Sequence, residues 1–348
     1  MNAKNTRLAA LTGIGPVSRP GIGIAELVAA PSLDDDSCRV EVRELDNFEP
    51  AEFLGKRGWK FMPPATRVAL AAVQLVLADA GTAPEQRAER TGVVVGTNFA
   101  VYQAVDQIDR ALLADGIAGI SPVLSPNFAV NVPVGNLSIT HGMKAFNITL
   151  VNLLTAGYES LLLGAGALAA GRAETVLAGA VEGPPPDAFL THTGQGADAG
   201  GACLLQMEDA EAARRRGARI YAVLTGGVRR TLPQDQRGTE RVLGTALDRL
   251  DIRPADRFQL SVPAGKDGLR AEEAIRGWAD RRGARGAVTV TRGAPQASVT
   301  SMLALARQLA RPAEGTAAGP DDRGLVCTAL GPQGNVVLLR LAPAGILQ

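Results

Sequence analysis

The feature of this sequence that most limits its fold is a regular alternation of short apolar runs with Ala-rich helical stretches. The apolar runs are rich in Val and Leu and lack polar alternation, which is typical of strands buried on both faces. The expected strands are Thr91–Gly96, Asn147–Val151, Thr175–Ala180, Ala202–Met207, Arg219–Leu224, Gln259–Val262, Ala287–Thr291, Gly324–Thr328 and Asn335–Leu341. The expected helices are Pro64–Ala80, Ala100–Ala114, Ala156–Ala170, Ala210–Arg216, Ala271–Arg282 and Val299–Arg311. This alternation predicts an α/β protein.

The charge balance argues against several kinds of partner. Lys and Arg number 36 against 35 Asp and Glu, the formal net charge is +1, and no basic tract is interleaved with aromatic residues. No run approaches the roughly 18 apolar residues that a membrane span requires, and the N-terminus lacks a signal-peptide pattern. The sequence therefore predicts a soluble, cytoplasmic protein that binds neither nucleic acid nor membrane.

The residues that could carry nucleophilic chemistry are few and scattered. Cys38, Cys203 and Cys327 form no CxxC or Cys/His metal spacing, so no metal or cofactor is expected. His141 and His192 are the only histidines, and neither has a Cys or Asp at an informative spacing. A pair assembled in space from Cys203 or Cys327 stays open, although both lie in apolar runs that keep a thiol protonated and inert. The residues alone indicate a large α/β protein without an evident active site.

Several segments, in order along nearly the whole chain, resemble those of the β-ketoacyl synthase family. They are Leu11–Ser18 (LTGIGPVS), Asp46–Gly81, Gly92–Thr97, Ile120–Thr149, Thr175–Glu182 and Arg214–Leu224 (RGARIYAVL at its end). On these segments the chain is identified as a member of this family, within the thiolase superfamily.

The resemblance implies a thiolase fold, in which two similar halves form five αβαβα layers. The halves are expected at residues 1–210 and 211–348, although the sequence shows no internal repeat by eye. The family dimerises through a strand beside the active site, and the matching residues here are Asn147, Ile148, Thr149, Leu150 and Val151. Pairing along this edge would order both subunits, because edge backbone groups find partners there.

The positions that carry catalysis in the family hold other residues in this sequence. The family uses a Cys at a helix N-terminus as nucleophile and two histidines that promote decarboxylation. The resemblance places the nucleophile at Leu154, the first histidine at Pro263, a lysine at Arg292 and the second histidine at Ala297. The late Phe-bearing loop of the family becomes Gly331–Gly334. Condensation by this chain alone is therefore not expected.

A ketosynthase-like chain that lacks the catalytic residues resembles the chain length factor, the β subunit of type II polyketide synthases. In that family this subunit completes the tunnel of a catalytic ketosynthase and limits polyketide length by steric obstruction. The residues that match tunnel-lining positions, and so form the expected gate, are Phe99, Tyr102, Gln103, Asp106 and Leu124. The competing interpretation is that Phe99 and Tyr102 simply fill a core.

The resemblance implies a heterodimer with a catalytic ketosynthase, reached by an acyl carrier protein, and no cofactor. Two alternatives stay open: a diverged enzyme for acyl transfer or decarboxylation that uses Cys327 or His192, and a stand-alone acyl-binding or scaffold homodimer. The segments Glu182–Ala199 and Pro312–Arg323 are shorter than in the family, and the lost-cysteine position is not the glutamine often found there. These departures favour a polyene-forming or otherwise reducing polyketide system.

Overall fold

The computed structural model describes residues 7–30, 45, 47–82, 87–122, 124–184, 200–263, 265–284, 286, 288–293, 298–311 and 323–347. Its strands are β1 (Ala9–Ser18), β2 (Gly21–Ile22), β3 (Thr91–Gly96), β4 (Phe146–Leu150), β5 (Thr175–Glu182), β6 (Gly201–Asp209), β7 (Ala222–Thr231), β8 (Arg257–Pro263), β9 (Val288–Gly293), β10 (Leu325–Leu330) and β11 (Asn335–Ala342). Its α-helices are α1 (Ile24–Ala29), α2 (Pro50–Leu54), α3 (Pro64–Ala80), α4 (Tyr102–Asp115), α5 (Val132–His141), α6 (Ala156–Ala169), α8 (Ala210–Arg215), α9 (Gln236–Leu247), α10 (Lys266–Arg281) and α11 (Ser298–Ala310).

The strands form one 11-stranded sheet whose two halves repeat the same strand order. The first half runs β4-β3-β5-β6-β1, and the second, read from the other end of the sheet, runs β9-β8-β10-β11-β7. In both halves the first three strands are parallel and the next pair is antiparallel. Three residue pairs join β1 to β7, from Ala9↔Leu224 to Leu11↔Ala222. The architecture is therefore duplicated, although the two halves share no repeat that can be recognised in the sequence.

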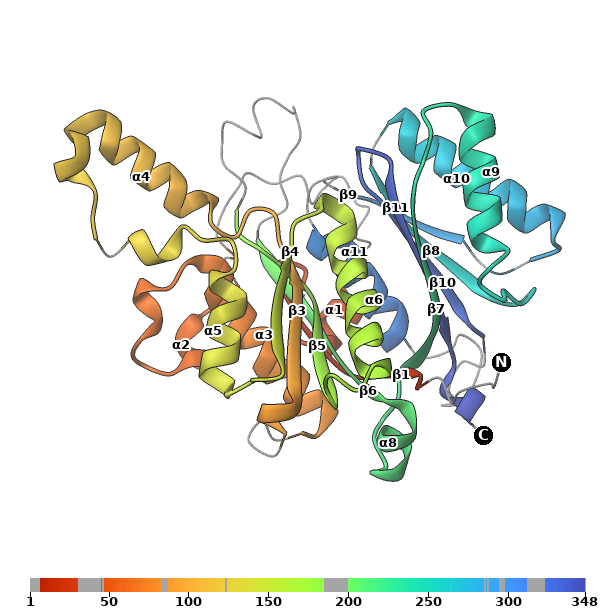
Figure 1. The fold of residues 1–348 in the computed structure, drawn as a ribbon, viewed down its shortest axis with the longest axis horizontal. Helices are drawn as coiled ribbons and strands as arrows, with labels where there is room; N and C mark the ends of the chain where they lie inside the picture. Colours follow the sequence, from red (N-terminus) through yellow and green to blue (C-terminus); the bar gives the residue numbers. More distant parts are fainter. Residues whose placement is uncertain are drawn as a thin grey trace.

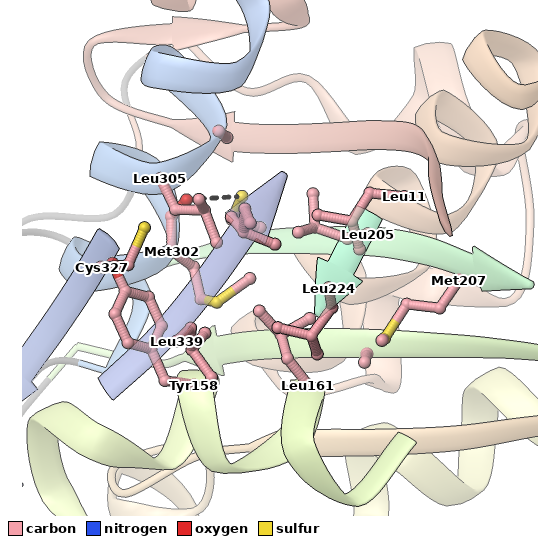
Figure 2. Close-up of a cluster of buried hydrophobic side chains, with 14 of the residues drawn as sticks. Leu11, Tyr158, Leu161, Leu205, Met207, Leu224, Met302, Leu305, Cys327 and Leu339 are labelled. Atoms are coloured by element: carbon pink, nitrogen blue, oxygen red, sulfur yellow. Dashed lines mark hydrogen bonds between the residues drawn. The ribbon is translucent and has the colours of Figure 1, made fainter. Parts of the chain in front are cut away.

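Three apolar clusters fill the spaces between five layers. One lies between α3, α5 and the first half of the sheet, and another between the second half and the pair α9 and α10. The central cluster surrounds α6 and α11, which pack against each other between the two halves (Figure 1). Figure 2 shows its side chains, among them Tyr158 and Leu161 from α6 with Met302 and Leu305 from α11. The expected five-layered αβαβα fold is confirmed.

Most of the expected elements form within a few residues of the expected bounds. Helix α3 ends as expected at Gly81, which adopts the left-handed conformation with φ 61°. Strand β7 was expected to end at Leu224, but it continues to Thr231 through Gly226 and Gly227. A Cβ on Gly227 would come within 2.0 Å of the Leu162 side chain, so the glycine admits close packing of α6 against this strand.

Two helices in the second half depart from the sequence expectation. Helix α10 starts at Lys266, five residues before the expected Ala271. This first turn was missed from the sequence because it is polar and carries no apolar pattern. Helix α9 was not expected at all, although its N-cap Asp235 accepts a hydrogen bond from the Gly238 N–H at 2.7 Å. The division of the chain into residues 1–210 and 211–348 stays a prediction.

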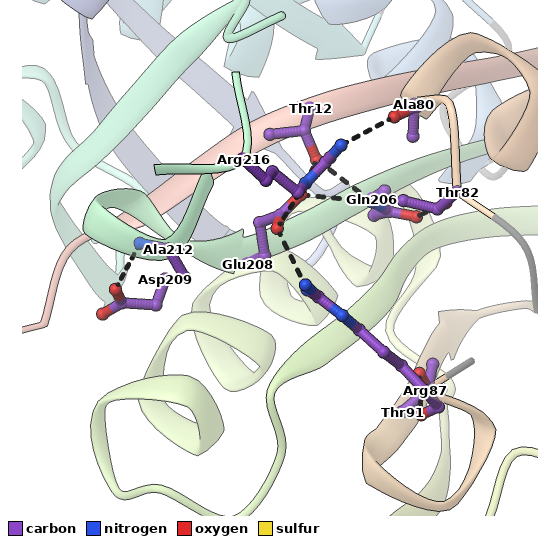
Figure 3. Close-up of polar contacts among 10 residues, drawn as sticks. All are labelled: Thr12, Ala80, Thr82, Arg87, Thr91, Gln206, Glu208, Asp209, Ala212 and Arg216. Carbon is purple, nitrogen blue, oxygen red and sulfur yellow. Dashed lines mark hydrogen bonds and ion pairs between the residues drawn. The ribbon is translucent and has the colours of Figure 1, made fainter. Parts of the chain in front are cut away.

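A buried polar cluster at the end of the sheet where β3 and β5 begin binds separate segments together (Figure 3). Glu208 on β6 is fully buried and accepts hydrogen bonds from Thr12 Oγ1 at 2.8 Å and from the Arg216 guanidinium. The Arg216 Nη1 also donates to the Ala80 carbonyl at 3.2 Å, and Arg87 lies 3.5 Å from the carboxylate. The cluster therefore ties β1, β6, α3 and the segment after α8 into one rigid unit.

Candidate functional site

The segment that holds the expected nucleophile position links an edge strand to a central helix. Strand β4 is followed by a single 3-10 turn, Leu153–Thr155, which leads directly into α6. Leu154 lies in this turn, at the carboxyl ends of the parallel strands β3 and β4, and its exposed fraction is 1%. A hydrocarbon side chain thus occupies the start of the central helix, a place where backbone N–H groups favour an anion.

The backbone immediately before Leu154 is strained. Leu153 has φ 46°, which is the left-handed region that a residue with a Cβ rarely adopts. The Asn98 side chain holds it there, because its Oδ1 accepts from the Leu153 N–H at 2.8 Å and its Nδ2 donates to the Leu153 carbonyl at 3.2 Å. This clamp directs the next side chain, that of Leu154, into the core.

Glu182, the last residue of β5, organises the groups around this turn. Its carboxylate accepts from Asn98 Nδ2 at 2.7 Å, from the Asn98 and Phe99 N–H groups at 2.8 Å each, and from Ser298 Oγ at 2.6 Å. Longer contacts come from the Ser298 N–H at 3.2 Å and Thr97 Oγ1 at 3.3 Å. Burial raises the pKa of Glu182, and the hydrogen bonds from Ser298, Asn98 and Phe99 oppose that rise.

Small residues let the central helix approach its neighbours closely. A Cβ on Gly96, at the end of β3, would lie 2.6 Å from Ala156, the first residue of α6. A Cβ on Gly157 would lie 2.5 Å from the Met302 side chain of α11. Ser301 Oγ donates to the Leu154 carbonyl at 3.1 Å, so the first turn of α11 contacts the expected nucleophile position directly.

A second polar cluster flanks the turn on its other side. Asn152 Nδ2 donates to Glu159 Oε1 at 2.5 Å, and Thr155 Oγ1 reaches the same oxygen at 3.1 Å. Asn335 Nδ2, from the start of β11, donates to Asn152 Oδ1 at 2.9 Å. These contacts bring the β10–β11 turn, and with it the expected Gly331–Gly334 loop, beside the Leu154 segment.

The other expected catalytic positions lie on neighbouring strands of the second half. Pro263 is buried and is the last residue of β8, paired in register with Gly293 of the parallel strand β9. Arg292, the residue before Gly293, forms an ion pair with Glu272 of α10. Ala297 lies outside the described residues, directly before Ser298 of α11. Proline has no N–H and no titratable group, so position 263 offers no proton-transfer chemistry.

The expected gate residues lie around the start of α4. Phe99 is 6% exposed and Tyr102 43%, and their ring centroids are 5.7 Å apart with an interplanar angle of 60°. Gln103 is exposed, Asp106 is half-buried and pairs with Arg110 at 2.8 Å, and Leu124 is half-buried in a later turn. The structure brings Phe99 and Tyr102 into contact, and Phe99 is joined to the Leu154 region through Glu182.

The expected dimer strand lies at one edge of the sheet. In the described part of the chain β4 pairs only with β3, and its residues are half-buried or exposed whereas those of β3 are all buried. The strand begins at Phe146 and ends at Leu150, one residue earlier at each end than expected, so Val151 lies just beyond it and is 60% exposed. The neighbouring helix α5 carries Ile139, which is 82% exposed.

The cysteines and histidines offer no alternative centre within the described residues. Cys203 and Cys327 are fully buried, and burial raises the pKa of both thiols, that of Cys327 to about 12. Cys38 and His192 lie outside the described residues, and His141 ends α5. The described residues contain no cluster of three metal-ligating side chains, and none of the helices they form is long and apolar enough to cross a membrane.

Sequence reasoning missed the polar residues that shape the site. Asn98, Asn152, Glu159, Glu182 and Ser298 were not singled out. Asn98, Glu182 and Ser298 act through partners that are distant in the chain, and Asn152, although its bond to Glu159 is local, also contacts the distant Asn335. The only local signal was the isolated carboxylate of Glu182 at the end of an otherwise apolar strand.

The five-layered fold, with a turn and a helix start beside the edge strand β4, is a thiolase-like fold, as in solved ketosynthase structures. The model of the beta-ketoacyl synthase N-terminal domain matches residues 25–199, just over half of the 348-residue chain, and the chain belongs to the beta-ketoacyl synthase family.

Curated relatives and solved structures agree with this assignment. The 3-oxoacyl-[acyl-carrier-protein] synthase 2 of Rhizobium meliloti is 25% identical over 307 residues, which cover 72% of each chain. The synthase of the same name from Vibrio harveyi is 28% identical over 207 residues, covering 52% of this chain and half of the relative. A type II polyketide synthase acyl carrier protein in complex with its ketosynthase contains a chain that superposes with a TM-score of 0.79 at 20% identity, covering 97% of this chain and 99% of that one. The ishigamide ketosynthase/chain length factor has a TM-score of 0.76 at 20% identity, with the same coverage.

Proposed function

We propose that this chain is a non-catalytic chain length factor that forms a heterodimer with a catalytic ketosynthase of a type II polyketide synthase. The observation that carries the proposal is Leu154, a buried hydrocarbon side chain at the start of the central helix, the position to which we assign the family's nucleophile. In this view the chain shapes the partner's tunnel and limits the length of the polyketide.

The chemistry of the site supports a role without catalysis. A ketosynthase needs a thiolate to carry the acyl chain and groups that promote decarboxylation of the extender unit. We assign the nucleophile position to Leu154 and the histidine positions to Pro263 and Ala297, and none of these side chains can accept or donate a proton. A cysteine nucleophile at Cys203 or Cys327 is disfavoured, because burial raises the pKa of both thiols and keeps them protonated.

The exposed edge of the sheet supports a role in assembly. Within the part of the chain that the structure describes, one side of β4 is unpaired and offers backbone donors and acceptors to a strand of a second subunit. Apolar side chains are exposed on the same strand-and-helix surface, with Ile139 on α5 at 82% and Val151 beyond β4 at 60%. Helix α4 extends outward from the body (Figure 1) and exposes Leu113 at 87%. We infer that a catalytic ketosynthase covers this surface.

The aromatic pair at the start of α4 supports a role in setting chain length. Phe99 is held by its backbone and buried, whereas Tyr102 is partly exposed and contacts its ring. Bulky side chains on a fixed backbone stop a growing chain because overpacking costs about 1–3 kcal/mol. We propose that an acyl carrier protein delivers the chain through the complex and that the product is a polyene or another reduced polyketide.

The experiment that tests the proposal compares this chain alone with the chain co-expressed with the ketosynthase encoded beside it. Size-exclusion chromatography should give a stable one-to-one complex, and that complex should elongate malonyl units. Elongation should survive the changes Cys38→Ala, Cys203→Ala and Cys327→Ala in this chain. Turnover of an acyl thioester by the isolated chain, lost on changing a cysteine or His192, would instead establish the enzyme alternative.

A further inference from the structure

We propose that Glu182 is the positioning residue of the chain-length gate, fixing Phe99 relative to the Leu154 turn. The inference rests on the proposed function and concerns a residue that carries none of the expected gate or catalytic roles. It follows from the way one buried carboxylate joins three segments that are far apart in the chain.

The first link runs from Glu182 to the gate. Glu182 Oε2 accepts from the Phe99 N–H at 2.8 Å, and the Phe99 carbonyl in turn accepts from the Tyr102 N–H at 3.2 Å. The rings of Phe99 and Tyr102 therefore belong to a stretch of backbone that the Glu182 carboxylate holds in place. Helix α4 touches the core only at its start, through Val101, Ala104 and Val105, and its N-cap makes no side-chain hydrogen bond.

The second link runs from Glu182 to the expected nucleophile position. Glu182 Oε1 accepts from Asn98 Nδ2 at 2.7 Å, and the same amide group donates to the Leu153 carbonyl at 3.2 Å. Ser298 Oγ donates to Oε1 at 2.6 Å, which attaches the first residue of α11. The Glu182 side chain thus fixes the positions of the gate, the Leu154 turn and the start of α11 relative to one another.

The carboxylate is suited to this task because directional bonds, and no counter-charge, hold it. Glu182 is 3% exposed, and in the part of the chain that the structure describes no Lys, Arg or His forms an ion pair with it. Six donor groups face its two oxygens, and four of them are N–H groups that can only donate, so each oxygen accepts at least two hydrogen bonds. Such a network allows one arrangement, because any displacement leaves a buried donor unpaired.

The test measures the length distribution of the polyketide made by the co-expressed complex. Glu182→Gln keeps the size of the side chain but turns an NH2 group toward some of the six donors. We expect the complex to assemble and the ratio of longer to native-length product to rise roughly three- to tenfold, the factor by which one lost hydrogen bond shifts an equilibrium. Phe99→Ala should shift length in the same direction, and adding Glu182→Gln to it should shift length no further.

Glu208→Gln is the matched control. Glu208 is also a fully buried carboxylate of the same half-sheet, but it lies at the other end of the strands and contacts no gate residue. This change should lower the melting temperature and leave product length unaltered. Should the Glu182→Gln complex fail to assemble, Ser298→Ala removes the 2.6 Å bond to Glu182 together with a 3.3 Å bond to the Gly96 carbonyl, and should give a smaller shift of the same sign.

The outcomes separate the two levels of the proposal. If Phe99→Ala lengthens the product while Glu182→Gln and Ser298→Ala leave its length unchanged, Glu182 is structural only and the inference fails. If Phe99→Ala leaves the length unchanged as well, the gate assigned under the proposed function is wrong.

Discussion

The side chain of Asn98 forms a two-point clamp on the backbone of Leu153, accepting its N–H at 2.8 Å and donating to its carbonyl at 3.2 Å. The clamped residue has φ 46°, a conformation that costs a residue with a Cβ roughly 1–2 kcal/mol. The strained turn therefore lies directly before Leu154, the position that we assign to the family's nucleophile.

Removing the clamp should release the strained turn. Asn98→Ala should lower the free energy of unfolding by about 2–3 kcal/mol, because it breaks two hydrogen bonds to Leu153 and one to Glu182. Leu153→Gly relieves the left-handed strain, so Asn98→Ala should cost less in that background. Urea unfolding of the four proteins checks this, and equal costs in both backgrounds would show that the clamp does not support the strain.

Restoring a thiol should not restore condensation. Leu154→Cys should destabilise the chain by about 1–3 kcal/mol, as a buried large-to-small change does. The isolated variant should form no condensation product from acyl and malonyl thioesters, because Pro263 and Ala297 supply no histidine. Mass spectrometry of the reaction products is the measurement, and a condensed product would mean that other residues promote decarboxylation.

A charge at the end of the edge strand should break the heterodimer. Val151→Asp should weaken association at least about tenfold, since a carboxylate would lose its water in the interface. Leu269→Asp is the matched control, because Leu269 is a similarly exposed apolar residue, at 50%, on the outer helix α10. Analytical ultracentrifugation of the two complexes compares them, and equal weakening would place the partner elsewhere.

The Glu208 cluster should make stability depend on acid pH. Burial raises the pKa of Glu208, but the hydrogen bonds and charge of Arg216, together with Thr12 and Gln206, outweigh it, so the pKa lies below the ordinary value of a glutamate. A lowered pKa stabilises the folded state above the unfolded-state value, and this contribution is lost as the pH falls from about 4.5 through the folded-state pKa.

Arg216→Met removes the main cause of that shift. It should cost about 3–5 kcal/mol at neutral pH, where it leaves a buried carboxylate short of its partner, and less in acid, where the carboxyl group is protonated. Arg90→Met breaks a pair whose side chains are more than half exposed and should change stability by less than about 1 kcal/mol. Unfolding free energies between pH 3 and pH 7 check both variants, and a pH-independent loss in Arg216→Met would refute the linkage.

Local patterns were sufficient for most of the secondary structure. Unbroken Val and Leu runs predicted β3 and β5, and the Ala-rich stretch ending at Gly81 predicted α3 to the residue. Helix α9 was missed because its apolar residues are sparse, and the extension of β7 was hidden by Gly226 and Gly227. Gly227 is explained only by the packing of α6 against that strand, because a Cβ there would meet the Leu162 side chain.

By itself the sequence determined the layered α/β class, the family, and the lack of a nucleophilic or titratable group at position 154. These properties depend on periodicity, segment order and residue type. The tertiary structure alone decided the duplicated strand order, the single-sided pairing of β4, and the meeting of Asn98, Glu182 and Ser298 around the Leu154 turn. The reason is physical: a hydrogen bond between Glu182 and Ser298 spans 116 residues of chain, and such a contact exists only after distant strands and helices have packed.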